Sequence, residues 1–359
     1  MLRGSLWVVA SCAALLPIGL AGAADEGVRV ADPVVHANLA IYLVHGATAG
    51  GAVPLTLAEA VASGRVKVRE TGSVNELTVE NTGDDEVFVQ AGDIVKGGQQ
   101  DRVLSVDLLL PPHSRRVPIA AFCVESGRWS ARGGEDAQQF SSATAAMPSQ
   151  EAKLAMRAYV AAASTVSALP AGQLRSAFAS DPPAADSFEP QTRIWDTVKK
   201  TQDQLERSVG APVAAPASPS SLQLSLENEK LKAAQAAYID VLQGAGESGN
   251  DVVGYVFAIN GKIAGGDIYA SNALFRKMWR KLLAANVTEA IGKNDAAAAA
   301  APPSADSVKA FLATAESARQ FERTLNANVR LAMRDADHTL YAETRRGDDS
   351  WVHKNYLAK

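Results

Sequence analysis

The sequence predicts an α+β fold in a single mixed domain: a β-rich N-terminal half with a sheet, a helical middle, and a β-hairpin followed by short C-terminal strands. Three observations support this prediction. Residues 34–124 contain short runs in which apolar and polar side chains alternate, the period of half-buried strands. Residues 148–242 are rich in alanine and space their apolar side chains as helices do. Residues 252–264 place Asn-Gly between two apolar runs. Because strands and helices occupy separate stretches, α+β is favoured over an alternating βαβ fold.

Each element of the first half follows from a local pattern. Residues 66–70 (Val-Lys-Val-Arg-Glu) alternate apolar and charged side chains, as a strand with one buried face does. A short helix over 55–62 should end before Gly64, because glycine is favoured just past a helix C-terminus. A turn is expected at 81–84 (Asn-Thr-Gly-Asp). Strands are predicted at 39–44, 66–70, 76–80, 86–90, 103–110 and 117–124.

The second half begins with helices and ends with strands. Asn260-Gly261 is the clearest turn signal, because a type I′ hairpin turn needs positive φ at both central residues. Ser271 is placed to cap the start of the next helix. Asp267 could contact a ligand, but capping of the same helix start is the favoured role. The tail over 329–356 should form two or three short strands. Helices are predicted at 148–168, 194–209, 222–242, 272–291 and 304–322, with Pro/Ala-rich loops at 211–220 and 295–303.

Residues 1–23 have the composition of a secretory signal peptide. A positive charge at Arg3, an apolar run and a stretch of small residues follow one another in the required order. We expect cleavage after Ala23, export to the periplasm or the extracellular space, and no stable membrane insertion afterwards. The mature chain should then have a flexible N-terminus at 24–32 and one domain over 33–357.

Two other interpretations of the N-terminus stay open. An uncleaved anchor would need about 20 apolar residues, whereas the apolar run covers residues 6–20 and is interrupted by Pro17. A lipoprotein would be attached through Cys12, because Val9-Ala10-Ser11-Cys12 has the look of a lipobox. Few apolar residues precede Cys12, however, and the apolar run continues past it.

Composition argues against several classes of function. The chain has a net charge of −4, and removing Arg3 with the signal peptide leaves −5, so nucleic acid is not an expected partner. Neither a His-x-x-x-His nor a Cys-x-x-Cys spacing is present, and no metal or other cofactor is expected. After loss of Cys12, Cys123 has no disulfide partner and is either a buried small hydrophobe, the commoner fate, or a reactive thiol. The oligomeric state is not predicted.

Residues 91–102 combine groups that hold small anions. Glycine pairs let backbone amides approach a ligand closely, and Lys and Arg supply positive charge. The Gly-Lys-Ser/Thr order of a P-loop is absent. A tight hairpin with a solvated tip would explain the same composition. The candidate ligand-binding residues of this loop are Asp93, Lys96, Gly97, Gly98, Gln99 and Arg102.

A second polar group follows at the end of the strand that contains Cys123. Trp129 beside Arg128 could stack on a flat ligand. Glu125 shares one face of the strand with Cys123, and a thiol with a nearby base would be a nucleophile. The alternative is structural, with Glu125 paired to Arg102 or Arg128 as a partly buried support. No catalytic residue is assigned; the candidate ligand-binding residues here are Glu125, Arg128 and Trp129.

These two segments resemble a known family. Ala-Gly-Asp-Ile-Val-Lys-Gly-Gly-Gln-Gln-Asp-Arg at 91–102 and Phe-Cys-Val-Glu-Ser-Gly-Arg-Trp at 122–129 are similar to one block of the ADP-ribosylglycohydrolase and rhodanese-phosphatase-superfamily-associated protein domain family. Residues 259–279 look like its second block, and the resemblance would cover about 33–357. It implies a single mixed α and β domain and a nucleotide-like or ADP-ribose-like ligand. It carries over no catalytic residue.

Three functions therefore remain open. The favoured one is a binding module for a small anionic ligand, held by the two loops. The second is an envelope structural or interaction protein, in which the loops serve as packing devices. The third is a hydrolase or transferase that uses Cys123 or Glu125. The arrangement of Arg102, Glu125 and Arg128 should separate the first two, because a ligand site needs them to line an open pocket.

Overall fold

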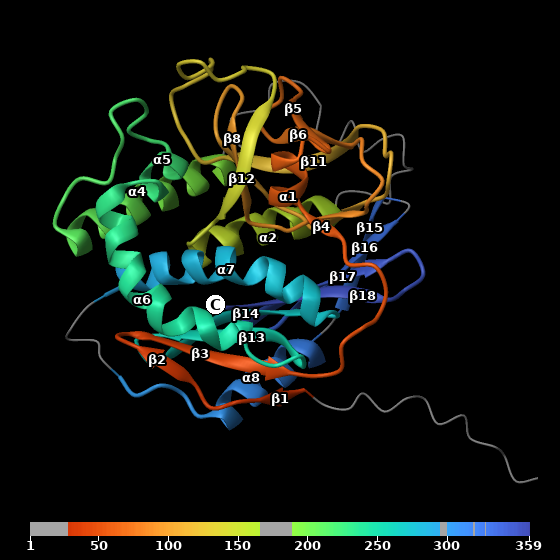
Figure 1. Cartoon of the computed structure of the whole chain (residues 1–359), viewed down its shortest axis with the longest axis vertical. Coiled ribbons are helices and arrows are strands. Elements are labelled where there is room, and N and C mark those ends of the chain that lie inside the picture. The colour runs from red at the N-terminus through yellow and green to blue at the C-terminus, as the bar shows by residue number, and fades with distance from the viewer. Residues whose placement is uncertain (1–27, 166–188, 295–299, 319, 327) are drawn as a thin grey trace, which may run out of the picture.

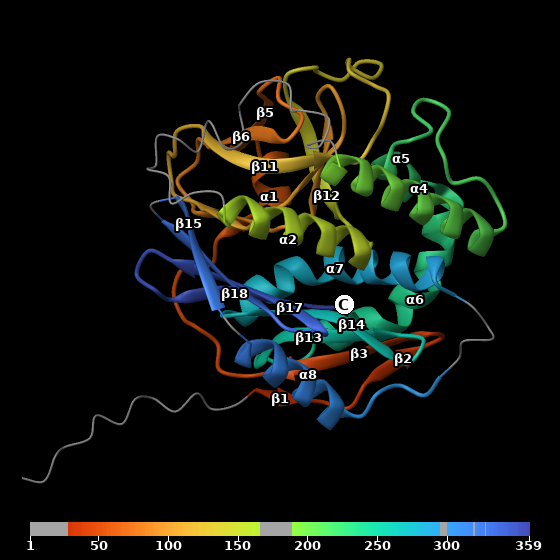
Figure 2. The same cartoon turned by 180° about the vertical axis from the view of Figure 1, so that it is seen from behind.

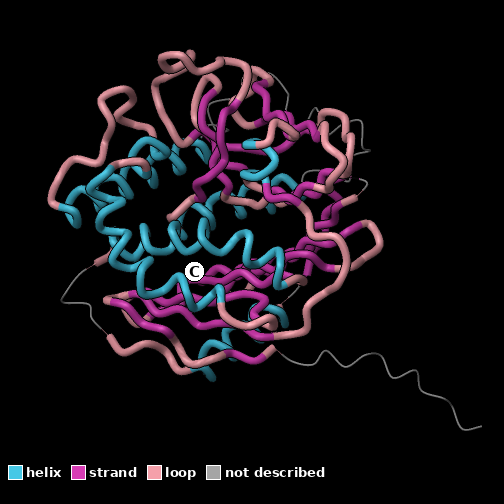
Figure 3. Tube along the Cα trace, in the orientation of Figure 1, coloured by secondary structure: helices cyan, strands magenta, loops and turns pink. Residues whose placement is uncertain are grey.

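The computed structural model describes residues 28–165, 189–294, 300–318, 320–326 and 328–359. The expected signal peptide, residues 24–27 of the expected flexible N-terminus, residues 166–168 of the helix predicted over 148–168 and part of the predicted loop at 295–303 lie outside these residues. The described part of the chain contains seven helices and eighteen strands, and the strands form three sheets. This composition confirms the α+β class. Figures 1 and 3 show a β-rich region at each end of the molecule and helices between them.

The larger β-rich region is one antiparallel sheet of nine strands. The predicted hairpin, β13 (Val252–Ile259) and β14 (Lys262–Tyr269), lies at its centre between β3 (Leu39–His45) and β18 (Trp351–Ala358). The other strands are β1 (Arg29–Val30), β2 (Val34–His36), β15 (Gln320–Asn326), β16 (Val329–Asp335) and β17 (Thr339–Arg346). Their order is β1-β3-β13-β14-β18-β17-β16-β15, and β2 also pairs with β3.

The turn of the central hairpin has the predicted conformation. Asn260 and Gly261 have φ angles of 51° and 73°, so both central residues are in the left-handed region. A Cβ at Gly261 would lie 2.7 Å from Ala300 Cβ, which makes glycine necessary for packing as well as for conformation. The predicted hairpin is therefore confirmed, and its central position in the sheet comes from the pairing of β13 with β3 and of β14 with β18.

The C-terminal strands correct two predictions. The helix expected over 304–322 is α8 (Ala305–Ser317), which stops early because β15 begins at Gln320. The expected short strands are three strands of seven or eight residues. Each of these strands pairs along its length with a neighbouring strand. This pairing makes the strand longer than the β propensity of its own residues predicts.

Helices lie between the two β-rich regions over part of their extent, whereas β16, β17 and β18 pack directly against the N-terminal region. The long helix α7 begins as predicted after Ser271, whose hydroxyl accepts a hydrogen bond from the Leu274 N–H. The helix expected over 222–242 is two helices, because Asn228 caps a new one. The bounds are α2 (Gln150–Thr165), α4 (Glu189–Val209), α5 (Leu222–Leu226), α6 (Glu229–Glu247) and α7 (Asn272–Gly292). None of the helices in the described ranges combines the length and apolar character needed to cross a bilayer.

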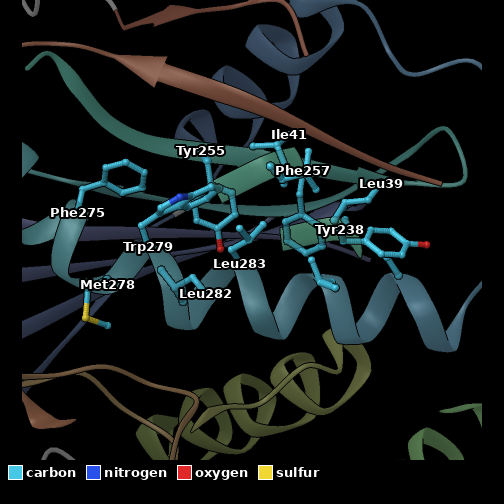
Figure 4. Close-up of a cluster of buried hydrophobic side chains, with 14 of the residues drawn as sticks. Leu39, Ile41, Tyr238, Tyr255, Phe257, Phe275, Met278, Trp279, Leu282 and Leu283 are labelled. Carbon is cyan, nitrogen blue, oxygen red and sulfur yellow. The ribbon is translucent and has the colours of Figure 1, made fainter. Parts of the chain in front are cut away.

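Apolar side chains cover both faces of the nine-stranded sheet. In β3, alternate residues from Leu39 to Leu43 pack in one core with α6 and α7, and those from Ala40 to Val44 pack in another with α8. Figure 2 shows α8 and α7 on opposite sides of the sheet. In Figure 4, Tyr255 of β13 lies beside Trp279 of α7, with ring centroids 5.3 Å apart. Because both faces of the sheet are buried, the sequences of its central strands are continuous apolar runs.

The N-terminal region contains the two smaller sheets and the short helix α1 (Leu57–Ala62). Thr56 and Glu59 form a capping box at the start of α1, and Gly64 has φ 70°, as expected past its end. The strands are β4 (Leu55–Thr56), β5 (Val66–Glu70), β6 (Glu76–Asn81), β7 (Val87–Val89), β8 (Asp93–Gly97), β9 (Arg102–Leu104), β10 (Leu108–Leu110), β11 (Val117–Cys123) and β12 (Phe140–Ala146). One sheet has the order β12-β8-β9-β11-β6-β5, and the other β10-β7-β4.

Three N-terminal predictions need correction. The loop expected over 91–102 is largely the hairpin of β8 and β9. The strand expected over 103–110 is two strands, β9 and β10, because the chain bends at Val106 between them. Strand β12 was not predicted, since its sequence, Phe-Ser-Ser-Ala-Thr-Ala-Ala, lacks large apolar residues at alternate positions.

Candidate functional site

The two segments singled out in the sequence meet in space. Residues 98–101 join β8 to β9, and β9 pairs with β11, which ends at Cys123, two residues before Glu125. The Asp101 backbone N–H donates to Glu125 Oε2 over 3.0 Å, and Arg128 Nη1 donates to the Gly98 carbonyl over 3.1 Å. Most of the predicted site residues therefore belong to one cluster.

Buried ion pairs fill the place where the segments meet. Glu125 and Asp101 are both completely buried. Arg128 donates to the two Glu125 oxygens over 2.7 and 2.6 Å, and Arg132 donates to the two Asp101 oxygens over 3.0 and 3.2 Å. Burial alone would raise the pKa of Glu125, but hydrogen bonds from Arg128 and Ser218 outweigh it and lower that pKa. We call Asp101, Glu125, Arg128 and Arg132 the loop ion-pair cluster.

Arg102 lies deeper, behind Trp129. Its guanidinium is completely buried and donates to Glu70 Oε2 over 3.2 Å, to Gln100 Oε1 over 3.3 Å, and to Cys123 Sγ. The half-exposed Trp129 ring has its centroid 5.3 Å from the Arg102 guanidinium carbon and covers it. Burial raises the pKa of the Cys123 thiol to about 12, so this sulfur is not an activated nucleophile.

The glycines of the loop serve internal packing. Gly97 and Gly98 have φ angles of 117° and 58°, which favour glycine. A Cβ on Gly98 would lie 2.6 Å from Glu70 Oε1, so the space beside this glycine is taken by the protein itself. The Gln99 backbone N–H donates to the same Glu70 oxygen over 2.9 Å. Glycine therefore lets the backbone come close to the Glu70 carboxylate, a group of the protein itself.

Two predicted residues lie apart from the others. Lys96 Nζ binds the Glu227 carboxylate at 2.7 Å, beside the C-terminus of α5. Asp93 is at the opposite end of β8 and pairs with Lys281 of α7. The structure therefore unites Gly97, Gly98, Gln99, Arg102, Glu125, Arg128 and Trp129, and separates Lys96 and Asp93 from them.

A groove of about 700 Å³ opens elsewhere, between α2, α4, α7 and the tip of the β13–β14 hairpin. Ile259, Ile263 and Leu154 contribute apolar walls. The cationic residues along it are Lys200, Lys262, Lys293 and Lys359. Its volume falls in the range of roughly 300–1,000 Å³ that is typical of small-molecule sites.

A buried carboxylate lies in the wall of this groove. Glu289 Oε1 accepts hydrogen bonds from the Gln150 N–H at the start of α2, over 3.1 Å, and from Lys293 Nζ, over 2.8 Å. The helix N-terminus and the ammonium group together stabilise this charge. Lys262, at the tip of the hairpin, is exposed and has no ion-pair partner in the described ranges, so it is free to meet a ligand.

Comparison with known proteins identifies the family. The family model described as ARPP-1, the ARG and Rhodanese-Phosphatase-superfamily-associated Protein domain, matches residues 27–357. The chain belongs to the ARPP-1 family. No curated protein and no solved structure gives a significant match. The family resemblance drawn from the two sequence blocks is thus confirmed.

The two blocks of the ARPP-1 domain occupy different places. The first block forms the loop ion-pair cluster. Asp267 of the second block is buried and accepts hydrogen bonds from His353 Nε2 over 3.0 Å, Asn355 Nδ2 over 2.9 Å and the Tyr255 hydroxyl over 2.8 Å. The prediction that Asp267 caps α7 is therefore wrong, because the side chain turns into the interior between the two β-rich regions.

Sequence reasoning missed the groups around Asp267. His353 Nδ1 lies 2.7 Å from Asp107 Oδ2, and Arg157 Nη2 lies 3.9 Å from Asp107 Oδ1. We call Asp107, Arg157, Asp267 and His353 the central polar cluster. Its members come from distant segments, so no local motif could reveal it; the only signal was a histidine within the apolar terminal strand. Within the described ranges, no group of three His, Cys, Asp or Glu residues is arranged to hold a metal ion.

Proposed function

We propose that this ARPP-1 protein binds a small anionic ligand in the groove between α2, α4, α7 and the β13–β14 hairpin. The observation that carries the proposal is the coexistence of a drug-sized volume, apolar walls and the unpaired Lys262. Apolar walls favour a ring or chain, and a lysine at the rim favours a phosphate or carboxylate. A nucleotide-like or ADP-ribose-like ligand has both parts.

The groove suits such a ligand better than the loop ion-pair cluster does. A guanidinium that already holds a buried carboxylate must give up that partner before it can bind another anion, and the abandoned carboxylate would remain buried and unpaired. Arg128 and Arg132 are in this position. The contacts of the cluster support the structural interpretation of these loops, and they give no support to chemistry at Cys123 or Glu125.

The test is isothermal titration with ADP-ribose, AMP, ribose 5-phosphate and citrate as probes. We expect at least one probe to bind, and Lys262→Ala to weaken it about 10- to 140-fold, as loss of a charge-assisted hydrogen bond does. Lys67→Ala is the matched control, because Lys67 is an exposed strand lysine outside the groove. Equal affinity in Lys262→Ala and the parent protein would exclude the groove, and the same loss in both variants would indicate only an effect of net charge.

We also propose that the protein is exported and cleaved after Ala23. The proposal rests on the order of charge, apolar run and small residues in 1–23. N-terminal sequencing of protein purified from the envelope or medium should begin at Ala24. An intact Met1, or a lipid on Cys12, would contradict cleavage at this position.

A further inference from the structure

A small cavity lined by Arg157 lies between α2 and the segment that joins β7 to β8. Its volume is about 20 Å³, enough for one water molecule or one monoatomic ion. Residues that line it include Gln90, Gly92, Lys153, Arg157, Asp267 and Asn355. We propose that this cavity is a binding site for a single chloride-sized anion.

Arg157 supplies the first argument. Its side chain is only 4% exposed, and Nη1 has no hydrogen-bond partner among the described residues. Its nearest carboxylate, Asp107, is 3.9 Å from the other terminal nitrogen, beyond hydrogen-bond range. A buried guanidinium N–H without an acceptor is unfavourable, and the cavity is the space in which an acceptor would sit.

The neighbouring carboxylates are occupied by other donors. Asp107 accepts hydrogen bonds from the Ala91 N–H over 2.7 Å, the Thr344 hydroxyl over 2.6 Å and His353 Nδ1 over 2.7 Å. Asp267 is bound by His353, Asn355 and Tyr255, as described above. Because both ring nitrogens of His353 face carboxylates, both carry protons and the imidazole is cationic. Neither carboxylate needs Arg157 as its main partner.

The charges around the cavity leave an excess of one positive charge. Asp107 and Asp267 contribute two negative charges, whereas Arg157, His353 and the half-buried Lys153 contribute three positive charges. The nearby Asp93–Lys281 pair is balanced. An uncompensated positive charge beside the buried Arg157 is unfavourable, and one bound anion would neutralise it. The size of the cavity admits a halide and excludes phosphate or an organic acid.

Two measurements on the whole mature protein test the proposal. In crystals of the unmodified protein soaked in sodium bromide, an anomalous peak should appear within hydrogen-bond distance of Arg157 Nη1. In solution, replacing sodium gluconate by sodium chloride at constant ionic strength should raise the melting temperature saturably by a few degrees, because a ligand that binds only the folded state stabilises it.

Variants connect the two measurements to the cavity. Arg157→Gln should abolish the chloride-specific rise, and Arg193→Gln, which changes an exposed arginine of α4, should retain it. If Arg157→Gln fails to fold, the bromide experiment on the unmodified protein decides alone. No anomalous peak at Arg157, or a chloride response identical to that of gluconate, would overturn the proposal and assign the cavity to water.

Discussion

At the scale of single residues, the loop ion-pair cluster shows how one composition can serve two purposes. Glycines, arginines and carboxylates in neighbouring loops are what an anion site needs, but they are also what a buried salt-bridge network needs. The complete burial of Glu125 and Asp101 decides between them. Each carboxylate has two or more donors, so the arginines stabilise charges of the protein itself.

Arg128→Ala should therefore act on stability rather than on ligand affinity. Removing this partner leaves Glu125 buried with only weaker donors, and we expect a loss of about 3 kcal/mol in the free energy of unfolding. Urea denaturation measures the loss, and titration of the folded variant should give unchanged affinity for the groove probes. Arg115→Ala is the control, because Arg115 is exposed and has no ion-pair partner among the residues that the structure describes. Loss of ligand binding without loss of stability would return these loops to the role of binding site.

At the scale of elements, the β13–β14 hairpin organises the large sheet. It is central in that sheet, and its turn is also part of the wall of the groove through Asn260 and Lys262. The same two-residue turn thus positions both the core strands and Lys262, the lysine that we propose binds the ligand. A change in the turn should affect both.

Gly261→Val should destabilise the protein measurably. A β-branched residue at φ 73° costs about 1–2 kcal/mol, and the added Cβ would collide with Ala300. The melting temperature should fall by several degrees. Gly134→Val is the control, because Gly134 has a negative φ and no atom within 4 Å of an added Cβ. An unchanged melting temperature in Gly261→Val would show that the hairpin tip rearranges without cost.

At the scale of the whole molecule, the central polar cluster joins the two β-rich regions. Asp107 belongs to the N-terminal region, whereas His353 and Asp267 belong to adjacent strands of the nine-stranded sheet. The imidazolium between the two carboxylates therefore bridges segments that are 246 residues apart in sequence. Its charge state couples the packing of the two regions to pH.

The bridge predicts a loss of stability at alkaline pH. Burial alone would lower the pKa of His353, but Asp107 and Asp267 outweigh it and raise that pKa from 6.5 to about 9. A pKa that is higher in the folded than in the unfolded state adds to the free energy of unfolding, here by about 3 kcal/mol. This contribution is fully present below pH 6.5 and is lost as the pH rises through about 9. Melting temperatures from pH 6 to pH 9.5 should fall accordingly.

The variant His353→Gln isolates this effect. It should be much less stable than the parent protein at pH 6, and the difference should shrink as pH approaches 9.5, because the parent then loses its imidazolium as well. His338→Gln changes an exposed histidine and should leave the pH profile intact. A constant difference between His353→Gln and the parent across this pH range would mean that His353 does not titrate there.

The sequence by itself determined the fold class, the ARPP-1 family, the hairpin at Asn260-Gly261, the Ser271 cap and the helix end before Gly64, because these depend on side chains that are close in the chain. Asn260-Gly261 and Ser271 act within one turn or one helix end, so their roles can be inferred from a few residues. Tertiary structure alone decided that the loop arginines face internal carboxylates, that Asp267 points inward, and where the groove and cavity lie. These outcomes depend on burial and on partners brought from distant strands, and the charge of an arginine does not reveal which anion it will meet.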